Sequence, residues 1–374
     1  MSKTRLTVSV GGGGVGKTTT SAALALAMAR SHKRTLVITV DPARRLADAL
    51  GAQVGQQAVP VSFGPDSDGW LYARMPDPRA SLDDFATWLF EDPVRRKHLM
   101  DNPAYRELGD SLAGVHELVT IGLLQHEVDS GKYDEVVLDT APSRHALAFL
   151  TYPGRLLGLL EARSLAWLAA LAHVADVSNL EEHPRTGLLE WGRSKVEALV
   201  GKVVGLEGLR NLSALFGDMV AVRERWAGLA RRTNTMLRDP TTRYFIIGAP
   251  TGGAMADVSY LANNLSRHGL NPSAIVLNRA EQDAPESEQV LRRTLDNGGA
   301  DRIDATMRDA LRTMLQTLGA EHTERSEAAR KACERLQAIA PAGTSIVRLP
   351  FVHRNEPRAI VVALADAWKA AGID

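Results

Sequence analysis

Short apolar runs alternate along the chain with longer segments whose apolar residues recur at helical spacing. The short runs are rich in β-branched residues and have the length of buried strands, and turn-forming residues follow most of them at once. They cover residues 6–10, 35–40, 71–75, 135–138, 243–247, 273–277 and 345–349. Strands that alternate with helices predict an α/β fold, in which a mostly parallel sheet is flanked by helices.

Two long stretches lack the strand pattern. Residues 151–235 carry Leu, Ala and Val at helical spacing, and residues 281–340 are polar, charged and helical in pattern. We interpret both stretches as helical insertions into one α/β core. The predicted organisation is a core at 1–150, a helical insertion subdomain at 151–235, and the completion of the core at 236–374, which includes the helical segment 281–340.

The first strand leads into the glycine-rich sequence GGGGVGKTTT. Its Gly11-xxxx-Gly16-Lys17-Thr18 spacing fits the P-loop pattern, in which backbone N–H groups cradle phosphate oxygens. The lysine reaches the β and γ phosphates, the threonine hydroxyl ligates Mg²⁺, and the following helix points its positive end at the anion. The preceding strand and the following helical pattern supply the context that the motif needs. Phosphate binding is therefore predicted for Gly13, Gly14, Val15, Gly16, Lys17, Thr18 and Thr19.

Acidic residues close two other strands of the predicted sheet. Asp41 follows the second strand, where a carboxylate can face the γ phosphate and orient an attacking water, although an Asp-Pro pair is also a common turn. Asp139 follows the strand at 135–138, at the Walker B position whose carboxylate holds Mg²⁺ directly or through water. Ligands of parallel sheets bind at the carboxyl ends of the strands, so we expect both carboxylates beside the glycine-rich loop.

Composition narrows the choice of partner and compartment. Lys plus Arg equals Asp plus Glu at 44 each, so no nucleic-acid partner is expected. Cys333 is the only cysteine, which excludes an internal disulfide and a zinc site built from several thiolates of one chain. The N-terminal residues show no signal-peptide pattern, and the apolar run at 164–175 is too short to span a bilayer. We therefore expect a cytoplasmic protein.

The motifs, taken together and in this order, resemble one family. The chain is similar to the arsenite-pump and tail-anchored-protein-targeting ATPases (ArsA/GET type), a deviant-Walker-A branch of the P-loop proteins, in the stretches GGVGKTTT, VDPARRLADAL, DTAPSRHALAFL, FIIGAPTGG, AIVLNRA and RLPFVHRNEPR. The resemblance covers residues 1–150 and about 240–370. It implies ATP and Mg²⁺ as cofactors, with Asp41 activating water and with Thr18 and Asp139 serving the metal. It also implies that the adenine is bound by Asn278, Pro350 and Phe351.

The chain departs from the family at the start of the loop. There the family has a signature lysine that reaches the partner's phosphates across a dimer interface, and this chain has Gly12. Loss of a comparable trans-acting cation, the arginine finger, slows hydrolysis by about 10³–10⁵-fold. Our hypothesis is that Arg144 or Arg45 replaces the missing charge in catalysis. The alternative is that both arginines form surface ion pairs of little energetic value.

A second departure concerns cysteine. The chain has no Cys-x-x-Cys motif, so the zinc that joins the two subunits of the targeting ATPases cannot be bound in the same way. An arsenite site also needs several thiols, and Cys333 is alone. Metalloid efflux is therefore the least favoured function.

The resemblance implies a Mg²⁺-dependent ATPase that works as a dimeric switch and couples its nucleotide state to a bound protein or membrane client. The dimer is either a homodimer or a heterodimer with a related ATPase. Residues 151–235 are the candidate client surface, although their apolar faces can equally pack as core. The alternative function is a weakly hydrolysing or non-hydrolysing nucleotide-binding scaffold, whose partner in a heterodimer carries the missing lysine.

Overall fold

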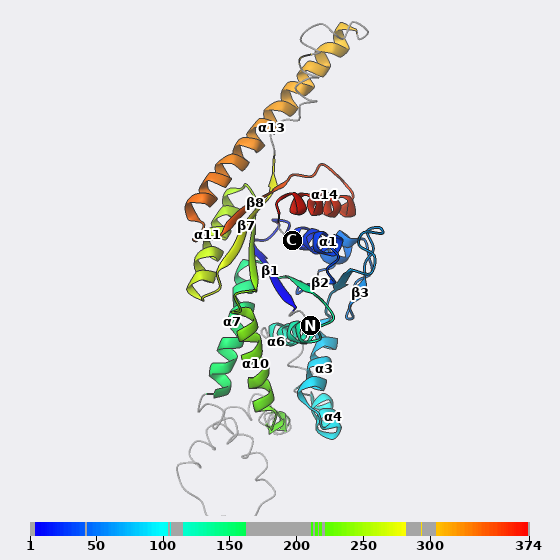
Figure 1. Cartoon of the computed structure of the whole chain (residues 1–374), viewed down its shortest axis with the longest axis vertical. Coiled ribbons are helices and arrows are strands. Elements are labelled where there is room, and N and C mark those ends of the chain that lie inside the picture. Colours follow the sequence, from blue (N-terminus) through cyan, green and yellow to red (C-terminus); the bar gives the residue numbers. More distant parts are fainter. Residues whose placement is uncertain are drawn as a thin grey trace, which may run out of the picture. The chain divides into compact units, whose positions relative to one another are not determined.

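The chain separates into two compact units. The first consists of Met1–Met75, Gly131–Leu147 and Pro240–Asp374, and the second of Pro76–Ser130 and Ala148–Asp239. The second unit is larger than the insertion predicted at 151–235, because residues 76–130, which the sequence assigned to the core, group with the helices instead. The structure is a computed structural model (Figure 1) that describes residues 4–41, 43–103, 105, 115–161, 211, 214–215, 217–218, 221–281, 293 and 304–372.

The first unit is built on an eight-stranded sheet with the strand order β3-β4-β2-β5-β1-β6-β7-β8. Its strands are β1 (Arg5–Gly11), β2 (Thr35–Thr39), β3 (Val59–Pro60), β4 (Leu71–Arg74), β5 (Glu135–Asp139), β6 (Arg243–Gly248), β7 (Pro272–Ala280) and β8 (Ser345–Pro350). Neighbouring strands run parallel except β3, which pairs antiparallel with β4. The predicted α/β fold with a mostly parallel sheet is confirmed. Strand β3 has only two residues and left no pattern in the sequence.

Helices cover both faces of this sheet. Figure 1 shows α1 (Lys17–Arg30) and α14 (Pro357–Ala370) on one side of the strands, and α11 (Gly252–Arg267) and α13 (Ala305–Ile339) on the other. Strands β2 and β5 are buried along their whole length, as is β1 after its first residue. Cover on two faces explains why these strands read as continuous apolar runs rather than as an alternation of apolar and polar residues.

Packing of α1 fixes the start of the helix that follows the glycine-rich loop. Every residue of α1 from Thr20 to Ala29 is buried, and most of them are small, so that α14 packs closely against it. Trp368 of α14 is fully buried, stacks on Phe245 with 5.6 Å between ring centroids, and donates its indole N–H to the Thr20 carbonyl oxygen at 3.3 Å. A buried indole with a hydrogen-bond partner holds the first turn of α1 in place.

The described residues of the second unit form helices and the short connections between them. It contains α3 (Pro78–Leu89), α4 (Pro93–Asp101), α6 (Val115–Asp129), α10 (Arg223–Leu237) and most of α7 (Ser143–Glu161). Asp77 and Asp92 cap α3 and α4, and a proline follows each of them at the first helical position. Of the predicted client surface, residues 162–210 lie outside the described residues. Among the helices that are described, none is long and apolar enough to cross a membrane.

Candidate functional site

The glycine-rich loop joins β1 to α1 in the middle of the sheet, where β1 lies between β5 and β6. Gly16 precedes α1 in the left-handed conformation, with φ of 88°, and no side chain caps the helix. The first turn of α1 also has no acidic residue. An uncapped helix start presents unsatisfied N–H groups and the positive end of the helix dipole, which is the arrangement that binds phosphate.

Glycine is favoured at two places in the loop, for a different reason at each. A Cβ at Gly13 or Gly14 would have no heavy atom within 4 Å, so these exposed residues leave open space above the loop. A Cβ at Gly16 would overlap the side-chain amide nitrogen of Asn278, and its positive φ also excludes most side chains. Val15 is buried in the core, so only its backbone is available to a ligand. Thr19 is half-buried in the first turn of α1.

Lys17 folds back over the loop. Its side-chain ammonium donates to the Gly12 carbonyl oxygen at 2.7 Å, and the residue is only 8% exposed. Burial lowers the pKa of Lys17, and the carboxylates of Asp139 and Asp41 act in the opposite direction. The lysine therefore lies in the position from which a phosphate oxygen can replace the Gly12 carbonyl as its partner.

Asp139 is the most deeply buried charge of the site. One carboxylate oxygen, Oδ2, accepts hydrogen bonds from the Thr18 hydroxyl at 2.8 Å and from the Thr39 hydroxyl at 3.0 Å. The other oxygen, Oδ1, is buried and has no hydrogen-bond partner in the described part of the chain. Burial raises the pKa of Asp139 to about 6, although the two hydroxyl groups and Lys17 stabilise the charged form. An unsatisfied buried carboxylate oxygen beside a threonine hydroxyl fits Mg²⁺, which prefers oxygen ligands.

Asp41 lies at the end of β2 and is held on both carboxylate oxygens. Oδ1 accepts from the Ala43 N–H at 2.9 Å, and Oδ2 accepts from the Arg45 guanidinium at 2.8 Å. The Asp41 side chain is mostly buried, whereas the Arg45 side chain is 64% exposed. The backbone N–H of Asp41 donates to the Thr39 hydroxyl, which in turn donates to Asp139. Thr39 thus links the loop that carries Asp41 to the Asp139 carboxylate.

Gly12 faces a carboxylate rather than open space. A Cβ at Gly12 would overlap Oδ2 of Asp257, a half-buried residue of α11. Asp257 also raises the pKa of Lys17, although four other effects on Lys17 are larger. The place from which a signature lysine would extend is therefore filled by a negative group.

The residues predicted to contact adenine come from the neighbouring strands β7 and β8. The Asn278 amide is buried and donates to the Val15 carbonyl oxygen at 2.9 Å, so it also supports the glycine-rich loop. After Asn278 the strand bulges, and Arg279 has a positive φ of 57°. Pro350 ends β8 opposite Ala280, and Phe351 follows it with 39% of its surface exposed.

The structure brings the predicted P-loop, Asp41, Asp139 and Asn278 together at one edge of the sheet. Arg144 is the second residue of α7, and its side chain lies outside the described residues. Sequence reasoning missed Thr39 and Asp257. A polar residue that ends an apolar strand was a usable signal for Thr39, whereas Asp257 is one polar residue among several of a helix and gave no signal.

Comparison with known proteins agrees with this geometry. A family model described as "Anion-transporting ATPase" matches residues 4–180, a range that contains the glycine-rich loop, Asp41 and Asp139. The ATPase get3 of Aspergillus terreus is 29% identical over 265 residues, which are 69% of this chain and 68% of that protein. The ATPase get3 of Aspergillus niger is 28% identical over 253 residues, which are 66% of this chain and 64% of that protein. The motifs, the parallel sheet and the loop geometry agree with these matches, and the chain is similar to the anion-transporting ATPases of the ArsA/GET type, whose members bind ATP.

Proposed function

We propose that this chain binds ATP together with Mg²⁺ and hydrolyses the bond between the β and γ phosphates. Lys17 and the backbone from Gly13 to Gly16 hold the phosphates, and Thr18 and Asp139 serve the metal. Asp41 orients the attacking water. The similarity of the chain to an ATPase family and the uncapped start of α1 behind the loop support this assignment.

One observation carries the proposal: the unsatisfied oxygen of Asp139. A buried carboxylate oxygen without a partner is costly, and a bound cation removes that cost. Asp139 Oδ1 is such an atom, and the Thr18 hydroxyl is bonded to the other oxygen of the same carboxylate. When bound, Mg²⁺ would neutralise negative charge on the phosphate oxygens. The residues of this chain contribute the anchoring oxygens and the dry surroundings that strengthen them.

Arg45 and Asp41 suggest how the chain prepares the attack. In this conformation Asp41 Oδ2 accepts a hydrogen bond from Arg45, so the ion pair competes with an attacking water for that oxygen. If the ion pair opens when ATP binds, Asp41 is released towards the water and the guanidinium is released towards the phosphates. Arg45 would then supply the positive charge that Gly12 lacks, and Arg144 is the other candidate for this role.

The proposed working form is a dimer in the cytoplasm that couples its nucleotide state to a protein or membrane client. The family resemblance supports the dimer, which is either homotypic or formed with a related ATPase. Client binding is assigned to residues 151–235 on the same ground. Mass measurement of the purified chain with and without ATP and Mg²⁺ tests the dimer, which is refuted if the mass stays that of one chain in both conditions.

ATP turnover of the purified chain tests the enzyme. We expect turnover that needs Mg²⁺, and that Lys17→Ala or Asp41→Asn abolishes. Asp366→Asn is the matched control, because Asp366 forms an exposed ion pair with Arg30 on the surface of the unit and should leave turnover unchanged. Turnover that persists in Asp41→Asn would remove Asp41 from the mechanism.

The second candidate function is a nucleotide-binding scaffold with little or no hydrolysis. Asp257 favours it, because a carboxylate at the signature-lysine position opposes the negative charge that develops on the phosphates. Arg45→Ala and Arg144→Ala separate the two functions. A large loss of turnover in either variant identifies the substitute cation, whereas wild-type protein that binds ATP without turning it over supports the scaffold.

A further inference from the structure

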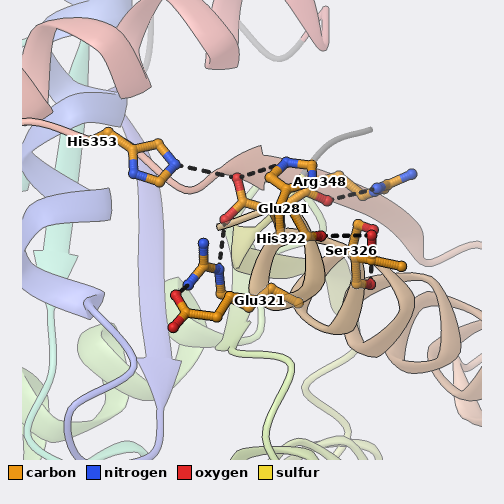
Figure 2. Close-up of polar contacts among 9 residues, drawn as sticks. Glu281, Glu321, His322, Ser326, Arg348 and His353 are labelled. Atoms are coloured by element: carbon orange, nitrogen blue, oxygen red, sulfur yellow. Dashed lines mark hydrogen bonds and ion pairs between the residues drawn. The ribbon is translucent and has the colours of Figure 1, made fainter. Parts of the chain in front are cut away.

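Glu281 is a buried acid outside the phosphate-binding loop. It follows directly after β7 and is 5% exposed, although it carries a carboxylate. Figure 2 shows its carboxylate at the meeting point of side chains from three parts of the first unit. These parts are the end of β7, the long helix α13 and the segment that follows β8.

Each oxygen of the Glu281 carboxylate has its own partners. Oε1 lies 3.3 Å from Nε2 of His353, in the segment after β8, and 3.6 Å from Nε2 of His322, on α13. Oε2 accepts a hydrogen bond of 3.1 Å from the Arg325 guanidinium, also on α13. The main-chain oxygen of Glu281 accepts from Arg348 of β8 at 3.5 Å. The acid therefore joins α13 to the segment that contains His353.

A carboxylate at this depth is stable only while its partners remain in place. Removing a charge from water costs several kcal/mol, and well-oriented ion pairs and hydrogen bonds must offset that cost. The Arg325 and His353 side chains are both exposed, at 46% and 62%, so Glu281 is the buried member that fixes both. The segment after β8 has no strand or helix of its own between Phe351 and Arg354, which leaves it dependent on such contacts.

His353 connects this cluster to the base end of the proposed nucleotide site. Its ring meets the Phe351 ring edge to face, with 4.7 Å between the centroids and 65° between the planes. Phe351 is an exposed aromatic residue, and Asn278, near the same end of β7 as Glu281, supports the phosphate loop through its bond to Val15. Aromatic faces at this position can stack on a purine.

From these contacts we propose that Glu281 is a positioning residue for base recognition. Through His353 it fixes the segment 351–354, and through His322 and Arg325 it anchors that segment to α13. This inference rests on the proposed binding of ATP. We expect the affinity of the site for the base to depend on Glu281 and its affinity for the phosphates to be independent of Glu281.

Two probes separate the base from the phosphates. Binding of Mg²⁺–ATP and of Mg²⁺–tripolyphosphate, which lacks base and ribose, is measured by calorimetry for wild type and for Glu281→Gln. Hydrogen bonds to charged groups are worth enough to predict about tenfold weaker ATP binding in the variant. Binding of tripolyphosphate should change less than about twofold, because Lys17 and the loop are untouched. Glu334→Gln is the control, since Glu334 pairs with Arg330 on the exposed surface of α13 and should alter neither affinity.

His353→Ala gives a second test that leaves the buried acid in place, and it should show the same selective loss of ATP affinity. The inference is overturned if both probes weaken equally in Glu281→Gln, because Glu281 would then support the unit as a whole. It is equally overturned if ATP affinity is unchanged in both variants. Wild-type protein that binds tripolyphosphate but not ATP would instead refute the proposed nucleotide, which is a separate failure.

Discussion

Replacing Asp139 with asparagine should make the stability of the nucleotide-free protein less dependent on pH. Burial raises the pKa of Asp139 from 3.8 to about 6, so the native protein binds this proton more tightly than the unfolded chain does. Stability from this group is therefore greatest at low pH and is lost as the pH rises from the unfolded value to the native value. Above that window the native state contains a buried charge that the unfolded chain exposes to water.

The size of the effect follows from the pKa difference. A shift from 3.8 to about 6 corresponds to about 3 kcal/mol over the whole window. Between pH 7.5 and pH 5 the linkage relation gives roughly half of that total, on the order of 1 to 2 kcal/mol. Asparagine can accept the same bonds from Thr18 and Thr39 through its carbonyl oxygen, and it leaves an unpaired N–H in place of Oδ1. That second cost does not depend on pH, so it cancels when the two pH values are compared.

The assay is urea unfolding of wild type and Asp139→Asn without nucleotide and with a metal chelator. The free energy of unfolding of the variant minus that of wild type should rise by roughly 1 to 2 kcal/mol between pH 5 and pH 7.5. Added Mg²⁺ should stabilise wild type more than the variant at the higher pH, because only the carboxylate provides a charged ligand. A difference that stays constant across the pH range would refute the raised pKa and with it the buried charge.

Two further substitutions test the fold around the site. Glu135→Gln should lower the free energy of unfolding by about 3 kcal/mol, because this fully buried acid pairs with the basic side chains of Arg5, Lys33 and Arg243. Urea unfolding measures the loss, and the exposed Asp366→Asn should show no comparable one. Gly16→Ala should destabilise the protein by more than the roughly 1 kcal/mol expected for a positive φ alone, because its methyl group would also overlap Asn278. Thermal unfolding of Gly64→Ala, which has positive φ but open space, provides the comparison, and equal losses in the two variants would remove the Asn278 contact from the explanation.

The parts of the site that repeat a local pattern could be predicted from the sequence. The spacing of the glycine-rich loop, and the acids that end β2 and β5, follow from the order of residues within single strand–loop units. That reasoning predicted the glycine-rich loop between Gly11 and Lys17 and an acid beside it. In the structure Asp139 accepts a hydrogen bond from the Thr18 hydroxyl. Roles in catalysis and metal binding for these residues stay predictions.

The rest depends on packing between distant segments, which no local pattern encodes. Helix α6 is apolar around much of its circumference, so its sequence does not say whether it packs on the sheet or among helices of a second unit. Asp257 reaches Gly12 only because α11 packs on the face of the sheet over β1, β6 and β7, and Glu281 meets His322 only because α13 returns beside β7. Such contacts have long sequence separations and are fixed by the fold as a whole.

The contact between Gly12 and Asp257 sets an order in which the family's lysine could return. A Cβ at position 12 would lie 3.1 Å from Cγ and 3.4 Å from Cβ of Asp257, besides overlapping Oδ2, so a lysine introduced first is crowded. A smaller neutral residue at 257 would remove the overlapping carboxylate. A lysine at position 12 is therefore accommodated more readily when position 257 changes first.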